Sequence, residues 1–250
     1  MASARCSLTL NLIGGFELLC DGEVQDLPEA SKRVVAFLGL HAKPQTRLYV
    51  AGSLWPEKPE TRASANLRSA LWRLNEPGQP ELVHSDGVML SLRDTVELDV
   101  RWLREVGWKL LDGSAHDAAA DADAVDRLLA WGVPSEKDVL FDELLPGWYE
   151  DWVLLERERL AELQVHLLDL VVGALVVEQR FPQAIDMALR MVALDPYRER
   201  SQLALIRAYL AEGSRGRARR QYDTFDQLLQ MSFGQACETS FNALCERTPC

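Results

Sequence analysis

The chain has 250 residues and a net charge of −11, with 48% apolar and 26% charged residues, a length that favours one large or two ordinary domains. This balance is that of a globular protein and excludes wholesale disorder. The negative charge argues against a general nucleic-acid binder, which would usually be basic. Between Lys43 and Asn75, however, six cations stand against two anions, and screening confines a field to about 8 Å, so this stretch can still bind phosphates.

Neither a secretory leader nor a membrane span is expected. Met1–Ser7 lacks a charged start followed by an apolar run. The most apolar helical stretch, Leu167–Val177, is too short to cross a bilayer and contains Asp169. The sequence therefore predicts a soluble cytoplasmic protein with no membrane partner.

The five cysteines have irregular spacing and form no C-x-x-C pair, which fits neither a zinc ribbon nor a thioredoxin-type site. One interpretation is that all are reduced thiols, several of them small core residues. The other is a redox-sensitive cluster of Cys237, Cys245 and Cys250. The sequence predicts no metal site and no cofactor.

The chain opens with strands. Ser7–Ile13 alternates apolar and polar residues with a period of two. Phe16–Cys20 and Glu23–Leu27 follow and are joined by Asp21-Gly22, a strong hairpin signal. A small antiparallel sheet is therefore expected before any helix.

Three helices are expected next. Ser31 is the predicted N-cap of a helix that runs to about His41. A short helix from about Leu48 to Trp55 is stopped by Pro56, and Thr61 is the predicted cap of a third helix to about Asn75. The segments Glu81–His84 and Val88–Leu92 then flank Ser85-Asp86-Gly87 as a second hairpin. Sheet, three helices and hairpin, in this order, are the layout of an α+β winged helix with an N-terminal antiparallel sheet, expected over residues 1–99.

Residues 100–250 are expected to be all-α. Asp99 is a good N-cap, Asp112–Asp123 reads as a loop or helix entrance, and Trp131–Pro134 and Leu145–Gly147 read as breaks. A long helix is predicted from Tyr149 to Glu178, with an apolar stripe formed by Trp152, Leu155, Leu160, Leu163, Leu167 and Leu170. An offset of 34 residues relates Ala174 to Ala208, Glu178 to Glu212 and Ala184 to Ala218, which matches the period of a tetratricopeptide unit. Helix pairs of this kind stack into a curved solenoid with a concave binding face.

The segment Thr61–Asn75 is predicted to be the DNA-reading helix. At 100° per residue one arc collects the core-facing side, namely Ala63, Leu67, Ala70, Leu71 and Leu74. On the other side Ala65 and Ser69 are small enough for the backbone to approach bases, Asn66 could pair with adenine and Arg62 with guanine, and Arg68 and Arg73 could clamp phosphates. The alternative is the solvated face of an ordinary amphipathic helix.

Three further features bear on this interface. Trp72 projects away from the predicted core, either to pack against the loop after Trp55 or the helical domain or, as the alternative, to contact DNA or a partner. Thr46 and Arg47 stand at the start of the second helix, where backbone N–H groups and the helix dipole favour a phosphate. The hairpin offers His84, Ser85 and Arg93 for contacts with DNA, although it also carries Asp86.

Six segments carry a shared pattern, in chain order Leu12–Phe16, Ser31–Leu38, Leu54–Pro56, Asn66–Leu74, Leu144–Trp152 and Glu156–Leu160. Together they resemble the antibiotic regulatory protein (SARP) activators of actinomycetes. The resemblance implies an OmpR/PhoB-type winged helix followed by a bacterial transcriptional activator domain, a tetratricopeptide-like helical module.

The resemblance also implies a function. Such activators bind direct repeats near a promoter −35 region, as a homodimer on double-stranded DNA, and recruit RNA polymerase, including its sigma subunit, usually at secondary-metabolite gene clusters. Carried over by position, the polymerase-facing loop is Pro56, Glu57, Lys58 and Glu60. Asn75 departs from the arginine common in the family, so one phosphate contact is in doubt. No G-x-x-x-x-G-K-[ST] motif occurs.

Two other functions compete with this one. A winged helix that does not bind DNA, joined to an acidic solenoid, would suit a regulator that binds a protein or a ligand. An enzyme is not expected, because the chain has no G-x-S-x-G, no H-E-x-x-H and no Gly-rich phosphate loop. The histidines His41, His84, His116 and His166 are scattered along the chain.

Overall fold

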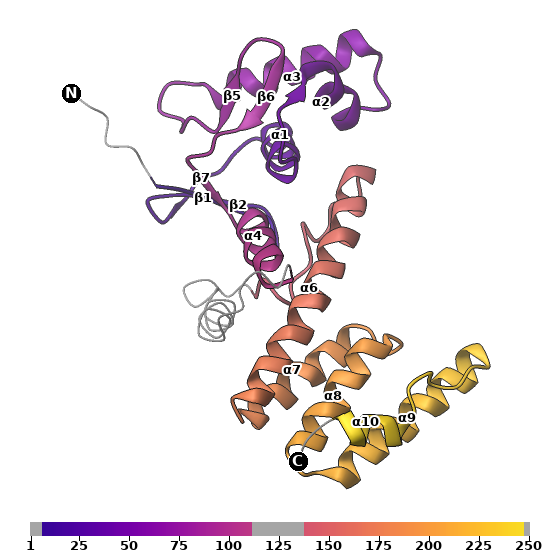
Figure 1. Cartoon of the computed structure of the whole chain (residues 1–250). Coiled ribbons are helices and arrows are strands. Elements are labelled where there is room, and N and C mark those ends of the chain that lie inside the picture. Colours follow the sequence, from indigo (N-terminus) through magenta and orange to yellow (C-terminus); the bar gives the residue numbers. More distant parts are fainter. Residues whose placement is uncertain (1–6, 112–137, 248–250) are drawn as a thin grey trace. The chain divides into compact units, whose positions relative to one another are not determined.

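The computed structural model describes residues 7–111 and 138–247, and confirms the expected fold class, a winged helix with an N-terminal sheet followed by a helical domain (Figure 1). The described residues form two compact units, 7–109 with 138–161, and 110–111 with 162–247. The boundary expected at residue 99 stays a prediction, since the first unit also contains chain from well beyond it. Asp112–Asp123 and Trp131–Pro134 lie outside the described residues.

The N-terminal sheet has the strand order β3-β2-β1-β7. Its strands are β1 (Leu8–Asn11), β2 (Glu17–Cys20), β3 (Glu23–Val24) and β7 (Val96–Leu98). The predicted alternation is confirmed, because Leu8, Leu10 and Leu12 are buried. Asp21 and Gly22 both have positive φ, 52° and 84°, which is the geometry that a two-residue hairpin turn requires. Strand β7, which the sequence pattern did not reveal, pairs parallel with β1.

Helices α1 (Glu29–Leu40), α2 (Arg47–Leu54) and α3 (Glu60–Leu74) follow in the expected order. The predicted caps Ser31 and Thr61 are wrong, because the residues before α1 and α3 are Pro28 and Pro59. The carbonyl of Pro28 accepts from Ser31 N at 2.8 Å, and that of Pro59 from Arg62 N at 2.9 Å. Ser31 is fully buried and its hydroxyl donates to the Ala70 carbonyl at 3.1 Å, so it ties α1 to α3 instead.

A second sheet forms the wing, with the strand order β4-β6-β5. Strands β5 (Val83–Ser85) and β6 (Met89–Leu92) are the predicted hairpin, and the short β4 (Gln45–Thr46) pairs with β6 through Thr46 and Met89. Because β4 leads directly into α2, the wing lies beside the first turn of that helix.

Helix α4 (Asp99–Leu111) begins at Asp99. This side chain is buried, and its Oδ2 accepts hydrogen bonds of 2.8 Å from the backbone N–H groups of Leu12 and Ile13. The carboxylate therefore fixes the end of β1 from a position almost ninety residues away in the sequence.

Residues 138–161 complete the packing of the first unit. Gly14 N donates to the Glu143 carbonyl at 2.8 Å, and Leu145 N to the Leu12 carbonyl at 2.9 Å. The Trp152 ring meets Phe37 edge-on at a centroid distance of 5.3 Å. Leu145–Gly147 lies outside any helix, as expected.

Helix α6 (Asp151–Val177) matches the predicted long helix to within two residues at its start and one at its end. The predicted stripe is partly wrong, since Leu155 and Leu170 are 54% and 38% exposed. Leu155 stands five residues before the buried Leu160, which turns it about 140° away at 100° per residue. Among the described helices α6 is the one whose length and composition would allow a membrane span. Seven of its apolar side chains are instead buried within the protein: Val153, Leu160, Leu167, Leu168, Val171, Val172 and Leu175.

The second unit contains α7 (Phe181–Leu194), α8 (Glu199–Ala211), α9 (Arg215–Phe233) and α10 (Phe241–Arg247). The 34-residue offset holds in its backbone hydrogen bonds. Glu178 N donates to the Ala174 carbonyl and Glu212 N to the Ala208 carbonyl, while Arg180 N donates to Leu175 and Ser214 N to Tyr209. Gln179 and Gly213, also 34 apart, both have positive φ, 59° and 86°. Helix ends one repeat apart therefore share one geometry, as stacked helix pairs require.

Candidate nucleic-acid interface

Helix α3 has one buried and one exposed side. The five residues predicted to face the core, Ala63, Leu67, Ala70, Leu71 and Leu74, are the buried residues of the helix. They anchor α3 against the rest of the winged helix and leave its other side free for a ligand.

The exposed side carries the predicted DNA contacts. Arg62, Arg68, Ser69 and Arg73 are exposed, and Ala65 and Asn66 are half-buried. Within residues 7–111 and 138–247, no carboxylate pairs with Arg62, Arg68 or Arg73, so their charge faces solvent. The Ser69 hydroxyl donates to the Ala65 carbonyl at 3.1 Å, so it would have to turn to read a base.

Trp72 does not pack as expected. Its side chain is 69% exposed, so the expected packing against the loop after Trp55 is wrong, while a contact with the helical domain stays a prediction. Together with Arg68, Ser69 and Arg73 it lines a surface hollow of about 400 Å³. The indole is therefore presented to solvent between two arginines.

The start of α2 lies beside the wing. The Thr46 hydroxyl caps α2 by accepting a 3.2 Å hydrogen bond from Tyr49 N. Arg47 donates through its backbone N–H to the Val88 carbonyl at 3.0 Å, and through Nη2 to Ser85 Oγ at 3.0 Å. Two predicted phosphate contacts and the wing thus form one continuous surface.

The wing itself is poor in free positive charge. His84 is exposed on β5, but the guanidinium of Arg93 pairs with Glu81 at 2.6 Å. The carboxylate of Asp86 accepts from Met89 N at 2.7 Å and Val88 N at 3.0 Å. These hydrogen bonds, that from Met89 first, lower the pKa of Asp86. The tip of the wing therefore stays negative, which weakens the case for a phosphate contact there.

The loop between α2 and α3 holds the predicted polymerase contacts, and Pro56, Glu57, Lys58 and Glu60 are all exposed. Beside it lies a groove of about 270 Å³, lined by Leu48, Ala51, Gly52, Trp55, Pro56, Lys58, Glu60 and Ala63. The sequence pattern did not reveal this groove. A Cβ built at Gly52 would meet no atom within 4 Å, so the groove has room for a larger side chain at this position.

A guanidinium from α1 holds the beginning of that loop. Arg33 Nη2 donates to the Leu54 carbonyl at 2.9 Å, and Arg33 Nε pairs with Glu150 at 3.0 Å. The last carbonyl of α2 is thus tied to the segment that leads into α6. No motif in the sequence signals this contact, because the three residues are far apart in the chain.

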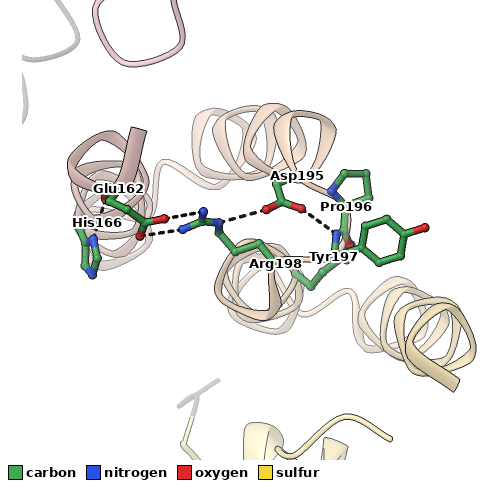
Figure 2. A network of polar contacts seen from close by, with 7 residues as sticks. Glu162, His166, Asp195, Pro196, Tyr197 and Arg198 are labelled. Atoms are coloured by element: carbon green, nitrogen blue, oxygen red, sulfur yellow. Dashed lines mark hydrogen bonds and ion pairs between the residues drawn. The ribbon is translucent and has the colours of Figure 1, made fainter. Parts of the chain in front are cut away.

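In the second unit, charged side chains pair with one another (Figure 2). Arg198 binds Glu162 through two nitrogens at 2.8 and 3.1 Å, and its Nε lies 3.3 Å from Asp195. The hydrogen bond from Arg198 is the main cause that lowers the pKa of Glu162. Asp195 also accepts from Tyr197 N at 3.1 Å, so this network fixes the turn between α7 and α8.

The cysteines fit the interpretation as small core residues better than the interpretation as a redox-sensitive cluster. Cys237 is buried and free, and burial is the main cause that raises its pKa to about 11, so its thiol stays protonated. Cys245 is also a free thiol. Cys20 is disulfide-bonded, so the expectation that every cysteine is reduced is wrong, and Cys250 lies outside the described residues. In the two described ranges, no group of three or more His, Cys, Asp or Glu side chains could hold a metal ion.

Comparisons with known proteins agree with this architecture. Residues 109–247 match the family described as "Bacterial transcriptional activator domain". The solved structure of Mycobacterium tuberculosis EmbR in complex with low affinity phosphopeptide is similar to the chain, with a TM-score of 0.77 and 22% sequence identity. That match covers 97% of this chain but 65% of the EmbR chain, and at this identity it shows the fold. A search of curated proteins finds no significant match.

Proposed function

Because the chain belongs to the bacterial transcriptional activator domain family, we propose that it is a transcriptional activator that binds double-stranded DNA sequence-specifically through α3. The observation that carries this proposal is the exposed side of α3. On a chain of net charge −11, three arginines of one helix side face solvent without a carboxylate partner in the described residues. A positive helix side with small residues between its cations suits a major groove.

Each side chain then has a role. Arg62 pairs with guanine and Asn66 with adenine, both as bidentate contacts. Ala65 and Ser69 leave room for the backbone to approach base edges. Arg68 and Arg73 bind phosphates and fix the register of the helix on the duplex.

Phosphates are also bound at the start of α2. Thr46 and Arg47 stand at the start of α2, where the helix dipole favours an anion, and the Arg47 guanidinium, which reaches Ser85, adds a positive charge there. His84 and Arg93 are weaker candidates, because Asp86 is ionised at the wing tip and Glu81 already neutralises Arg93.

The resemblance to the SARP activators supplies the finer proposal. Two copies bind direct repeats near a promoter −35 region, head-to-tail, with reading helices about one DNA turn, roughly 34 Å, apart. The exposed loop of Pro56, Glu57, Lys58 and Glu60 contacts RNA polymerase, including its sigma subunit. The genes activated belong to a secondary-metabolite cluster, and the protein acts in the cytoplasm.

The test is a footprint of the whole protein on the DNA that flanks its own gene, followed by salt titration of the protected duplex. Specific binding should weaken log-linearly with salt. Arg62→Ala should lower affinity by about 1–3 kcal/mol and relax preference at one base pair. Arg68→Ala should weaken binding to all DNA sequences alike and reduce the salt slope by about one. Unchanged affinity in both variants would remove this side of α3 from the interface, and protection of inverted repeats would contradict the head-to-tail arrangement.

A second function, a regulator that binds a protein or ligand through its helical module and no DNA, is favoured by the acidic wing tip. The same experiment separates the two functions. Absence of saturable binding to any fragment around its gene would exclude the DNA-binding activator and leave the alternative.

A further inference from the structure

Trp72 is the large apolar side chain that α3 leaves in solvent. It is 69% exposed, and within the described parts of the chain its indole N–H makes no hydrogen bond. Its neighbours in the surface hollow are Arg68, Ser69 and Arg73. An exposed indole between two free guanidinium groups is suited to a ligand that offers both anionic oxygens and an apolar surface.

The position of Trp72 along α3 narrows the choice of ligand. It stands seven positions after Ala65, which is nearly two full turns, so both side chains lie on the same side of the helix, about 10 Å apart along its axis. In helix-turn-helix proteins the N-terminal residues of the reading helix contact the base edges. Two turns further on, the helix has moved outward from the base edges, toward the sugar and phosphate at the rim of a groove about 12 Å wide.

The sizes of the side chains along the exposed side of α3 agree with this orientation of the helix in the groove. Ala65 and Ser69 are small where the backbone approaches the bases, and the bulky indole comes only at the C-terminal end. An indole offers a flat apolar ring and one N–H donor. A deoxyribose offers an apolar face, and the adjoining phosphate offers an acceptor oxygen.

We propose that Trp72 contacts the DNA backbone, with its ring against a deoxyribose and its Nε1–H donating to a phosphate oxygen, while Arg68 and Arg73 bind the neighbouring phosphates. This contact rests on the proposed function of α3 and adds an uncharged, sequence-independent component to it. It fixes how deeply the helix enters the groove.

The test compares two labelled duplexes, one that the whole protein selects from a randomised library and one with the same bases scrambled. Trp72→Ala should lower the affinity for both duplexes by the same factor, about tenfold, as expected for the loss of one aromatic contact. Because the indole carries no charge, the salt slope should not change, whereas Arg73→Ala should reduce the slope by about one. Trp72→Phe, which keeps a ring and loses the donor, should lose less affinity than Trp72→Ala.

Trp108→Ala is the matched control, since Trp108 lies on α4 in the same unit and is 67% exposed; it should bind both duplexes like the unaltered protein. Unchanged affinity in Trp72→Ala would overturn the contact. A loss of affinity for the selected duplex without a loss for the scrambled one would show base reading and overturn the backbone assignment. If the unaltered protein binds neither duplex, the proposed function fails and the contact with it, whereas failure of Trp72 alone leaves α3 as the reading helix.

Discussion

Three arginines of α3 and six arginines of the second unit have opposite surroundings. Six arginines of the second unit lie within 4.0 Å of a carboxylate, namely Arg180, Arg198, Arg200, Arg207, Arg217 and Arg219. Arg62, Arg68 and Arg73 have no such partner among the described residues. The six arginines of the second unit are neutralised by carboxylates within the fold. Arg62, Arg68 and Arg73 keep their positive charge, which water solvates and which only an anionic ligand would neutralise.

The largest expected effect is on DNA binding. Replacing Arg62, Arg68 and Arg73 together by alanine should lower affinity for the selected duplex by a hundredfold or more and reduce the salt slope by about two, because one base contact and two phosphate contacts are lost. Fluorescence anisotropy across a salt series measures both quantities. The matched control replaces Arg200, Arg207 and Arg219, which are 47%, 47% and 56% exposed. Equal losses in the two triple variants would abolish the distinction between the two sets.

The next effect concerns a paired arginine of the first unit. Glu156 is 12% exposed, and lies 2.6 Å from Arg104 and 2.5 Å from Arg159. Glu156→Ala leaves Arg104 partly buried without its anion, so the free energy of unfolding should fall by about 2–3 kcal/mol. Urea unfolding followed by circular dichroism measures the change. Glu158→Ala, at an exposed position on the same helix, should leave the midpoint in place, and equal midpoints for the two variants would refute the pairing argument.

A smaller effect should depend on pH. Arg198 lowers the folded-state pKa of Glu162, so this pair stabilises the fold above the unfolded-state pKa, about 4.3, and the contribution is lost as pH falls through the lower folded value. Glu162 is 53% exposed, so Glu162→Gln should cost at most about 1 kcal/mol at pH 7. The cost should vanish in acid. Urea midpoints at a series of pH values test this, with the exposed Glu238→Gln as control. A difference that persists unchanged in acid would contradict the ion-pair origin.

The smallest effect is a gain in stability. Gln179 has a φ of 59° at the position where the following repeat has Gly213. A left-handed backbone costs a residue with a Cβ about 1 kcal/mol relative to glycine. Gln179→Gly should therefore raise the free energy of unfolding by up to about 1 kcal/mol, and Gly213→Ala should lower it by a similar amount. Thermal unfolding of both variants checks the pair, and a loss in Gln179→Gly would show that its side chain supports the helix end.

Local patterns predicted much of the fold and part of the site. The strand β1, the wing hairpin, the core side of α3 and the 34-residue offset follow from periodicity and turn residues, which act over a few positions. The caps of α1 and α3 did not follow, because Pro28 and Pro59 precede these helices and tertiary structure uses the Ser31 hydroxyl elsewhere.

Contacts between distant segments also could not be predicted from local sequence patterns. The pairing of Arg93 with Glu81 depends on a register that only the folded hairpin fixes. The sequence could not decide whether Trp72 is exposed or packs against a neighbour, because an exposed and a covered tryptophan have the same spacing in a helix. Which of the candidate side chains are free to meet a ligand thus became visible only in the folded chain.

The hydrogen bonds that Leu12, Ile13 and Gly14 donate to Asp99 and Glu143 have a consequence for recombination between regulators. A chimaera that exchanged everything after residue 99 would separate Phe37 from Trp152 and Arg33 from Glu150. The winged helix of such a chimaera would pack against a segment that does not match its own core. The boundary between the two compact units lies inside α6, near residue 161. Chimaeras that fold should therefore be joined within that helix and not after β7.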